Sequence, residues 1–452
     1  MIILQKKHWS MGYKIKIISR HNMISLLIVF TSGLLFAQNK TKLEGTLVVV
    51  SEASYEFKNE TIQKTELILK PEFVLKLKNR SKFVLKGQVY FEFQDNLEKG
   101  KPTEQMVSDI SKRLFLGNRT NLEIRELYYY ANFKKLKLTV GKQQIVWGET
   151  DGLKLLDVVN PQNFREFILD DFEDSRIPLW SLKADFKIND YSVQLVWIPD
   201  NTYHITQDFS APFFTQSIFK NPPEGIAIQL NQTNIPNAFF KDSDIGFKIS
   251  GFKKGWDFSL NYLYYYDDLP VFYNNFNNQT TTIEIFPTYK RQHLIGGTFN
   301  KVFGSTTFRG ELVYIFNQNF TSNNNINQGI EQSNFYKSAF GLDYIKGEYM
   351  VSVQLFNEWI TKIISAYNRD VFETNGSLLI SKELMNDNVK AEILWVHSFN
   401  HADGYITPQL SYWLTTNTQL LLNSHVFYGE KNQLFGQFRN RSRVSFGFKW
   451  SL

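Results

Sequence analysis

The end of the chain alternates strictly between apolar side chains and polar or small ones. The apolar positions are Val444, Phe446, Phe448, Trp450 and Leu452, and the intervening ones are Arg443, Ser445, Gly447, Lys449 and Ser451. A period of two sustained over this length predicts a β-strand with one apolar face. The same alternation recurs at residues 67–77, 83–93, 256–266, 306–316, 389–397 and 404–428. We therefore expect an all-β chain.

The start of the chain has the composition of an export signal. A basic stretch at residues 14–20 precedes an apolar run at residues 24–36, and a small residue follows. This order predicts a secretory signal peptide over residues 1–37. Met11 is a more natural start than the first methionine, so residues 1–10 are a possible mis-called extension. No other segment approaches the length of apolar sequence that a membrane-spanning helix needs, about 20 residues.

Two architectures contain strands with one apolar face. In a soluble sandwich that face forms the core. In a transmembrane antiparallel β-barrel it contacts lipid, and the polar face lines the lumen. The strands expected here span about 10–13 residues, against roughly five or six in soluble sheets, and Tyr, Trp and Phe gather toward strand ends, as at a membrane interface. Both features favour a membrane barrel formed by residues 38–452.

The connections between the expected strands alternate in length, as in outer-membrane barrels. Tight turns are expected near residues 79–81, 133–135, 189–190, 253–255, 302–304, 346–348, 385–388 and 417. Longer connections are expected at 94–120, 148–177, 200–242, 267–287, 317–335 and 429–440. The pattern predicts 18 strands, or 16 if the weakest segment, 372–384, is not a strand. The Asn-rich stretches 274–278 and 317–328 are interpreted as solvated loop tips.

Charge and cysteine content exclude several classes of partner and site. Of the 50 basic residues, five lie in the first 37 positions, which contain no acid, so 45 basic residues face 44 acidic ones in the remainder. This balance gives no support for a nucleic-acid partner. The absence of cysteine excludes disulfides, thiol nucleophiles and Cys-containing metal sites.

The expected lumen face carries charges of both signs. These are Lys70, Glu72, Lys86, Glu92, Glu123, Arg125, Lys137, Lys183, Asp185, Lys248, Asp257, Arg309, Glu311, Glu358, Glu392, Arg443 and Lys449. Neither sign dominates, so ion selectivity stays open. We expect most of these charges to pair with one another, and a smaller share to set selectivity.

Residues 148–177 are unusually apolar for a connection exposed to water. Asn160–Pro161 is typical of a helix start, and Phe164, Phe167, Ile168 and Phe172 follow at the spacing of one helical face. An apolar face on a loop has to be buried, and the barrel interior is the nearest place. We therefore expect an inward-folded constriction or plug that carries a short helix.

The same segment carries a family resemblance. The sequences WGETDGLKLLDVVNPQNFREF and EDSRIPLWSL resemble the signature of a Gram-negative outer-membrane β-barrel family of unknown function. The matching positions are Trp147, Gly148, Glu149, Asp151, Gly152, Asp157, Asn160, Pro161, Arg165, Glu166 and Arg176. Members are often encoded near RND/MMPL-type exporters and a LolB-like periplasmic protein. The resemblance implies a role in envelope transport, for hydrophobic or lipid-like molecules, with periplasmic or inner-membrane exporter components as partners.

Two arginines of the motif are the main candidates for fixing the loop. Arg165 and Arg176 could pair with Glu149, Asp157, Glu166 or Asp174, because guanidinium–carboxylate pairs have a defined geometry. The alternative is direct contact with a substrate. The C-terminal strand resembles the signal that the barrel-assembly machinery recognises, so this machinery and outer-membrane lipid are expected partners.

Other functions find less support. No HExxH, GxSxG or phosphate-binding glycine loop is present, so we expect no catalytic residues, no metal and no cofactor. An outer-membrane hydrolase would use Ser424, His425 or His397, but Ser424 and His425 fall on opposite faces of their strand. The acidic cluster at residues 170–174 lacks the spacing of a calcium loop. An adhesin or structural barrel stays open, with recognition by the aromatic loop 200–242, which contains His204, Phe213, Phe214 and Phe219.

Overall fold

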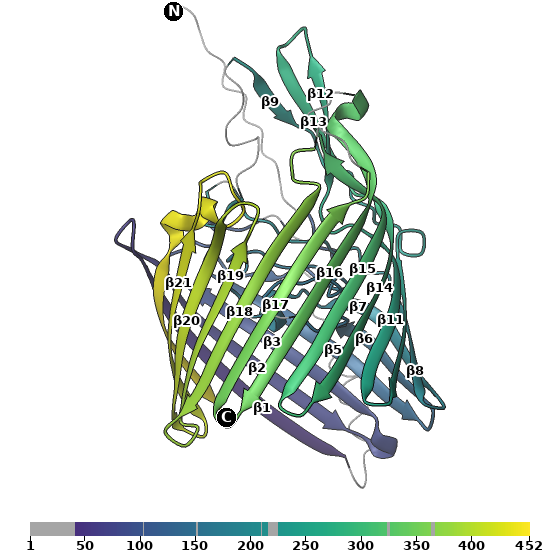
Figure 1. Cartoon of the computed structure of the whole chain (residues 1–452), viewed down its shortest axis with the longest axis vertical. Helices are drawn as coiled ribbons and strands as arrows, with labels where there is room; N and C mark the ends of the chain where they lie inside the picture. The colour runs from purple at the N-terminus through teal and green to yellow at the C-terminus, as the bar shows by residue number, and fades with distance from the viewer. Residues whose placement is uncertain are drawn as a thin grey trace, which may run out of the picture.

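The computed structural model describes residues 41–452, except 103, 151, 209, 216–224, 323–325 and 363–366. The predicted signal peptide lies outside these residues. Eighteen long antiparallel strands form one closed barrel (Figure 1). They are β1 (Lys42–Glu56), β2 (Thr61–Lys76), β3 (Lys82–Glu92), β5 (Thr120–Phe133), β6 (Leu136–Gln143), β7 (Leu179–Ile188), β8 (Tyr191–Ile198), β10 (Asp244–Lys253), β11 (Trp256–Tyr266), β14 (Arg291–Phe303), β15 (Thr306–Thr321), β16 (Ile330–Lys346), β17 (Tyr349–Ile360), β18 (Phe372–Leu384), β19 (Val389–Ser398), β20 (Asp403–Thr415), β21 (Thr418–Tyr428) and β22 (Arg443–Ser451).

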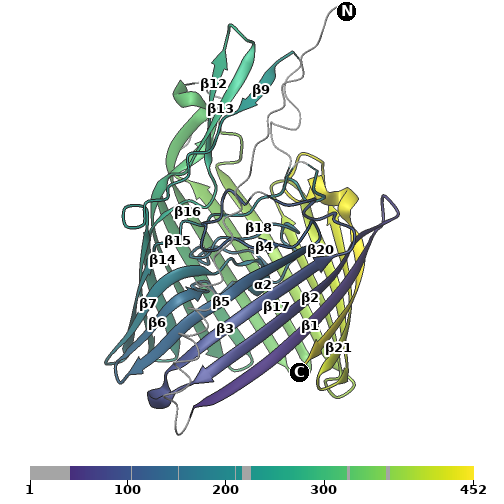
Figure 2. The same ribbon diagram turned by 180° about the vertical axis from the view of Figure 1, so that it is seen from behind.

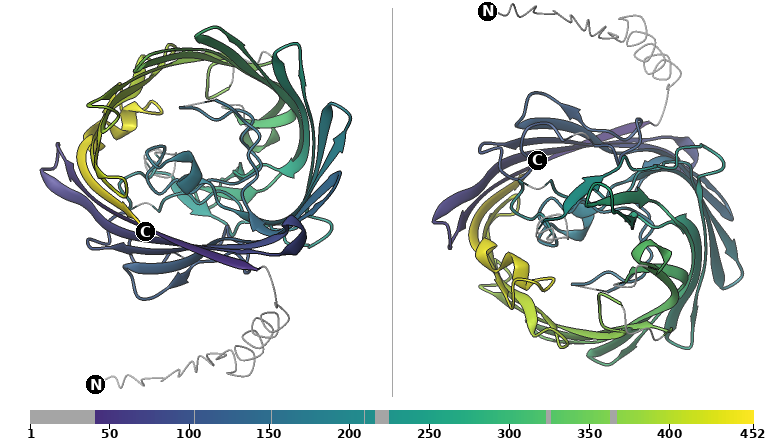
Figure 3. Two further views of the ribbon diagram at one scale, coloured as in Figure 1. Left: turned by 90° about the horizontal axis from the view of Figure 1, so that it is seen from below. Right: turned by 90° about the horizontal axis from the view of Figure 1, so that it is seen from above.

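The first and last strands close the barrel. β1 pairs with β22 from Val48 opposite Ser451 to Glu56 opposite Arg443, and every other strand of the barrel pairs with its neighbours in sequence. The segment that was weakest in the sequence is β18, a full strand. The prediction of a closed 18-stranded antiparallel barrel is therefore confirmed, and Figure 3 shows the ring from both ends.

The alternation in sequence decides which side chains face out. In β22, Phe446 is 55% exposed on the outer face, whereas Arg443 and Ser445 are buried on the lumen side. A barrel that spans a bilayer needs this distribution, because lipid replaces water around its outer face. The barrel core is therefore the lumen, and its polar residues have to find partners there.

The two ends of the barrel differ. One end, where the C-terminus lies, has tight turns, several of which place Asn or Gly at positive φ, as at Asn79 and Gly255. The other end carries the long connections, including a separate sheet of β9 (Ala227–Leu230), β12 (Val271–Asn277) and β13 (Thr282–Thr288), which stands above the barrel (Figure 1). The short β4 (Leu114–Phe115) pairs with β5.

One expected loop is shorter than predicted. Residues 317–335 were expected to form a long connection, but β15 continues to Thr321 and β16 begins at Ile330. These strands continue to pair above the rest of the barrel, with an irregularity between Ile315 and Gln318. The helices are short: α2 (Phe172–Ser175) and the 3-10 turns η1 (Lys78–Arg80), η2 (Ile326–Gly329) and η3 (Gly436–Arg441). None of the helices in the described part of the chain is long and apolar enough to cross a membrane.

Candidate channel constriction

The connection between β6 and β7, residues 144–178, folds into the barrel (Figure 2). β6 ends at Gln143, five residues before the predicted start of the connection at residue 148, so the motif begins inside the lumen. Trp147, Leu155 and Leu156 are almost completely buried. They pack against apolar side chains on the inner wall, which are Val196, Leu263, Leu294, Val313, Ala339 and Phe356. This segment is named the inner loop below.

Two wall glycines make room for the inner loop. A Cβ atom on Gly246 of β10 would lie 2.8 Å from the Trp147 ring, and one on Gly296 of β14 would lie 2.5 Å from Leu156. Glycine therefore lets the wall backbone approach these large side chains. The Trp147 indole N–H donates to Gln194 Oε1 at 2.8 Å, so its one polar group is satisfied.

Glu311 anchors the start of the inner loop. This β15 side chain is 1% exposed, and its carboxylate accepts the backbone N–H groups of Thr150 at 2.8 Å and Leu156 at 3.1 Å. It also accepts the N–H of Glu149. Arg309, two residues earlier on the same face, donates to the Glu149 carbonyl and pairs with Asp343 at 3.0 Å. Two lumen charges thus hold the loop backbone directly.

The far end of the inner loop is held by charges on β2 and β5. Arg125 donates to the carbonyl oxygens of Glu173 at 3.0 Å, Asp174 at 3.2 Å and Arg176 at 2.7 Å. Lys70 contacts the Asp174 carboxylate at 2.6 Å. Within the loop, Arg176 pairs with Asp157 at 2.7 Å. A cationic strand residue that binds carbonyl oxygens fixes backbone position as well as charge.

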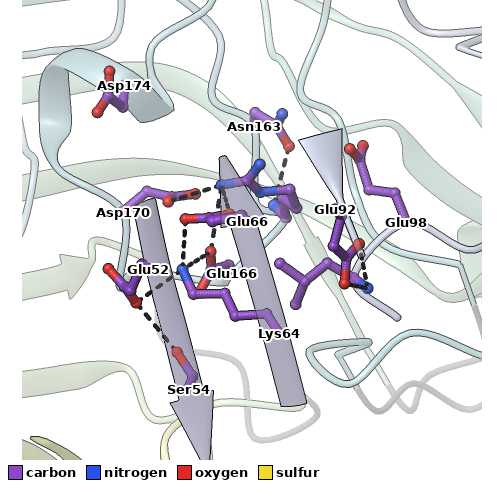
Figure 4. Close-up of polar contacts among 12 residues, drawn as sticks. Glu52, Ser54, Lys64, Glu66, Glu92, Glu98, Asn163, Glu166, Asp170 and Asp174 are labelled. Carbon is purple, nitrogen blue, oxygen red and sulfur yellow. Dashed lines mark hydrogen bonds and ion pairs between the residues drawn. The ribbon is translucent and has the colours of Figure 1, made fainter. Parts of the chain in front are cut away.

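A buried charge cluster joins the middle of the inner loop to the barrel (Figure 4). We name it the Glu166 cluster, and its members are Glu52 of β1, Lys64 and Glu66 of β2, Arg443 of β22, and Arg165, Glu166 and Asp170 of the loop. Lys64 contacts Glu166 at 2.7 Å, Glu66 at 2.9 Å and Glu52 at 3.0 Å. Arg443 donates to the other Glu166 oxygen.

Arg165 connects the remaining carboxylates of the Glu166 cluster. Its guanidinium lies 3.3 Å from Asp170, 3.6 Å from Glu66 and 4.5 Å from the centre of the Tyr90 ring. Burial raises the pKa of Asp170 to about 7, although Arg165 opposes this shift. Burial would also raise the pKa of Glu166, but Arg443 and Lys64 hold it well below its usual range. The cluster therefore holds Glu166 charged and leaves Asp170 close to its titration point at neutral pH.

A polar cavity of about 560 Å³ lies beside the inner loop. Its lining comes from β1–β3, β5, β19–β22 and the loop, and includes Lys64, Arg125, Glu392, Gln409 and Asn423. A second cavity of about 480 Å³ adjoins it and shares Lys70, Arg125 and Asp174. Together they form a charged, water-compatible space along the side of the lumen that the loop's apolar residues leave free.

The inner loop brings together most of the motif residues singled out in the sequence. Arg165 and Arg176 find the acidic partners expected of them, Glu166 and Asp157. The Asn160 side chain accepts the Ile145 N–H and donates to the Ile177 carbonyl, and the Pro161 carbonyl accepts the Ile177 N–H. The other motif residues are placed as follows: Gly148 lies against Asp157 and Glu311, Gly152 lies near Val396, and Asp151 lies outside the described residues.

The predicted lumen charges divide among several roles. Lys70, Arg125, Arg309, Glu311 and Arg443 contact the inner loop, as described above. Among the others, Lys86 pairs with Glu126, Glu92 accepts the N–H groups of Asn96 and Leu97, Glu123 pairs with Arg125, Asp185 accepts from Gln194, and Glu358 pairs with Lys337. Glu72 lines the second cavity, Glu392 and Lys449 line the first, and Lys183 lies opposite Thr139. Among the described residues, no group of three or more His, Asp or Glu side chains is placed to hold a metal ion.

The inner loop carries a short helix, as predicted, but the predicted start of this helix at Asn160–Pro161 is wrong. Gln162 and Asn163 form isolated β-bridges with Arg176 and Ile205, and helix α2 begins only at Phe172. The phenylalanines therefore separate: Phe167, at a positive φ of 59°, packs against Phe438, whereas Phe164 packs against His204. Backbone hydrogen bonds to distant segments form here in place of helical ones, so these tertiary contacts override the helical spacing of the phenylalanines.

Sequence reasoning missed several partners of the inner loop. Lys64, Glu66 and Glu52 lie on the lumen faces of their strands, which alternation could have shown, but nothing local shows that they meet Glu166. Phe213 of the 200–242 connection is 1% exposed and packs against Phe427 and Phe438, so this aromatic also lies inside. Phe219 of the same connection lies outside the described residues.

Comparisons with known proteins identify the family and the fold. The family described as protein of unknown function (DUF1302) matches residues 94–450. No curated protein matches the chain. Among solved structures, Pseudomonas aeruginosa OccK8 (OprE) matches with a TM-score of 0.53 at 7% identity, covering 91% of this chain and 98% of that one.

Two further structures show the same likeness. Acinetobacter baumannii OccAB3 matches with a TM-score of 0.51 at 10% identity, over 91% of this chain and 99% of its own. Pseudomonas aeruginosa OpdK, solved with vanillate, matches with a TM-score of 0.50 at 9% identity, over 91% and 98%. At these identities the likeness shows the fold, a porin-like barrel.

Proposed function

This chain belongs to the DUF1302 family, and from that premise we propose that it is an outer-membrane channel of a Gram-negative cell, narrowed by its inner loop. The observation that carries this proposal is the way the loop is held inside a closed barrel. Buried carboxylates from the wall and the loop, Glu311 and Glu166, fix it at two places. A loop tied so firmly narrows the lumen in the resting protein.

The space that remains suits a transport path better than an active site. The two polar cavities lie side by side along β1, β2, β3 and β5 and share Lys70, Gln88 and Arg125. Their charges of both signs would keep this part of the lumen filled with water and would solvate the polar groups of a passing solute. We propose a non-enzymatic role without metal or cofactor.

A finer role follows from the family resemblance of the motif. We propose that the channel is the outer component of an envelope transport route that also includes periplasmic or inner-membrane exporter components. Hydrophobic or lipid-like molecules are the substrate class that the resemblance suggests. We propose that the barrel-assembly machinery recognises β22 during insertion, because aromatic side chains alternate along this strand.

Single-channel recording in a planar bilayer tests the channel proposal. Deletion of residues 150–176 should raise the conductance of the purified protein, since it removes the apolar part of the constriction. A control deletes residues 273–286, most of the β12–β13 hairpin, which stands outside the barrel (Figure 1). If the folded loop deletion conducts no better than the unmodified protein, the inner loop does not constrict the path.

A further inference from the structure

The hydrogen-bonded ladder between β20 and β21 is interrupted at Pro408. Ile406 pairs with Val426 and Gln409 pairs with Asn423 in one continuous register, but between them neither Thr407 nor Pro408 is paired with β21, although both are paired with β19 on the other side. Proline lacks the N–H that a ladder needs, so such a position weakens the wall. On the lumen side, the Thr407 hydroxyl and His425 Nδ1 lie 3.2 Å apart, so a side-chain contact spans the interruption.

An apolar groove of about 450 Å³ lies on the outer face at the same place. Its outward-facing lining consists of Ile380, Lys382, Ala391, Ile393, Pro408, Leu410, Leu422, Ser424 and Val444. The Lys382 ammonium lies over the Tyr349 ring, 4.5 Å from its centre. Ala391, Pro408 and Ser424 are smaller than the leucines and isoleucines around them, which leaves a depression in the wall. The groove is thus formed by side chains of five neighbouring strands, β18–β22.

The groove lies within the lipid-facing band of the barrel. Toward the long-connection end, Trp395 donates its indole N–H to the Tyr428 hydroxyl at 2.7 Å. Toward the tight-turn end lies Tyr412, which pairs with Leu420 and is 40% exposed. Aromatic side chains of this kind mark the two membrane interfaces of a barrel. The groove between them therefore faces hydrocarbon chains.

The outer groove and the lumen cavity meet at the same three residues. Glu392, Gln409 and Asn423 line both the 450 Å³ groove and the 560 Å³ cavity. One strand layer therefore separates the apolar space outside from the charged space inside, directly beside the interruption of the β20–β21 ladder at Thr407 and Pro408. These observations are independent of one another and coincide at Pro408.

We propose that the wall at Pro408 is a lateral portal that binds an amphipathic lipid, with its alkyl chain in the outer groove and its polar head group in the lumen cavity. This inference rests on the proposed channel function and names a route for its substrate. The apolar groove suits an alkyl chain, because it removes methylene groups from water. The lumen cavity supplies hydrogen-bonding and charged groups that a head group needs when it leaves the membrane interface.

Cysteine reactivity in lipid vesicles tests the portal, because the chain has no cysteine of its own. Asn423→Cys and Gln88→Cys each place one thiol in the same lumen cavity, the first at the portal and the second on the opposite side. The protein is reconstituted into phosphatidylcholine vesicles and treated with N-dodecylmaleimide, which partitions into the bilayer. Parallel samples receive N-(2-hydroxyethyl)maleimide, which reaches the cavity through water.

A portal predicts that the dodecyl reagent labels Asn423→Cys faster than Gln88→Cys, by about tenfold after normalisation to the water-soluble reagent. Adding Ser424→Trp, which fills the groove from outside, should abolish this advantage. Leu414→Trp, an outward substitution on β20 beyond the groove, should leave it unchanged.

Equal normalised rates at the two positions would overturn the portal while leaving the channel intact. If the water-soluble reagent labels neither thiol in the folded protein, the channel proposal fails instead. In that case, dodecyl labelling of Asn423→Cys would still support the portal, and its absence would overturn the portal as well.

Discussion

The carboxylate of Glu166 on the inner loop binds the guanidinium of Arg443 on the last strand, although 277 positions separate them in the sequence. Both side chains are at most 2% exposed. The same carboxylate also binds Lys64 on β2. One residue of the loop therefore ties together the strands on both sides of the barrel closure, so that loop position and barrel closure depend on each other.

Removing this carboxylate should destabilise the barrel. Glu166→Gln leaves Lys64 and Arg443 buried without their shared charge partner, and breaking a buried pair in this way costs about 3–5 kcal/mol. We expect a clear fall in the temperature at which the barrel unfolds. This temperature is measured from the change in gel mobility of the protein after heating. Glu173→Gln is the matched control, because this carboxylate on the same loop is 75% exposed. Equal effects of the two substitutions would contradict a structural role for the Glu166 cluster.

Weakening the Glu311 anchor should open the constriction without unfolding the protein. The backbone N–H groups of the inner loop are accepted by both carboxylate oxygens of Glu311, whereas the side chain in Glu311→Gln has only one acceptor oxygen. Each buried hydrogen bond that is lost costs about 1–3 kcal/mol of stability. We expect larger or noisier single-channel currents, because Thr150 and Leu156 are no longer both held. Glu358→Gln serves as control, since Glu358 pairs with Lys337 and Arg369. Unchanged currents in Glu311→Gln would show that the anchor does not control the path.

Stability should depend on pH through Asp170. Burial raises its pKa from 3.8 to about 7, so the folded protein holds this proton more tightly than the unfolded chain does. The contribution of this group to stability is therefore greatest below about pH 4 and is lost as the pH rises toward about 7. Unfolding temperatures measured from pH 4 to 8 should fall less steeply in Asp170→Asn than in the unmodified protein. Parallel curves for the two proteins would contradict the raised pKa.

The fit of Trp147 against the wall can be tested at Gly246. A Cβ atom there would lie 2.8 Å from the Trp147 ring, so Gly246→Ala has to displace the ring or the strand. Overpacking of this kind costs about 1–3 kcal/mol, which should lower the unfolding temperature. Gly45→Ala is the control, because its nearest atom, on Phe73, would lie at an ordinary 3.4 Å. Equal unfolding temperatures in all three proteins would mean that Trp147 is not tightly packed.

Much of the architecture could be predicted from the sequence because it depends on local pattern. Alternation with a period of two determines which side chains of β22 face lipid, and the turn residues near Asn79 and Gly255 end the strands. Long, one-faced strands with alternating connection lengths lead to an 18-stranded barrel. The apolar composition of residues 148–177 likewise requires burial, which predicted an inward loop.

Only the tertiary structure decided how that loop is built. The spacing of Phe164, Phe167 and Phe172 favoured a helix, but bridges from Gln162 to Arg176 and from Asn163 to Ile205 take up the backbone instead. The contacts of Glu166 with Lys64 and Arg443 depend on barrel closure. The positions of the outer groove and the lumen cavity on either side of Pro408 depend on it as well. Local sequence determines faces and turns because these involve neighbouring residues. Contacts between residues hundreds of positions apart exist only once the closed barrel brings their strands together.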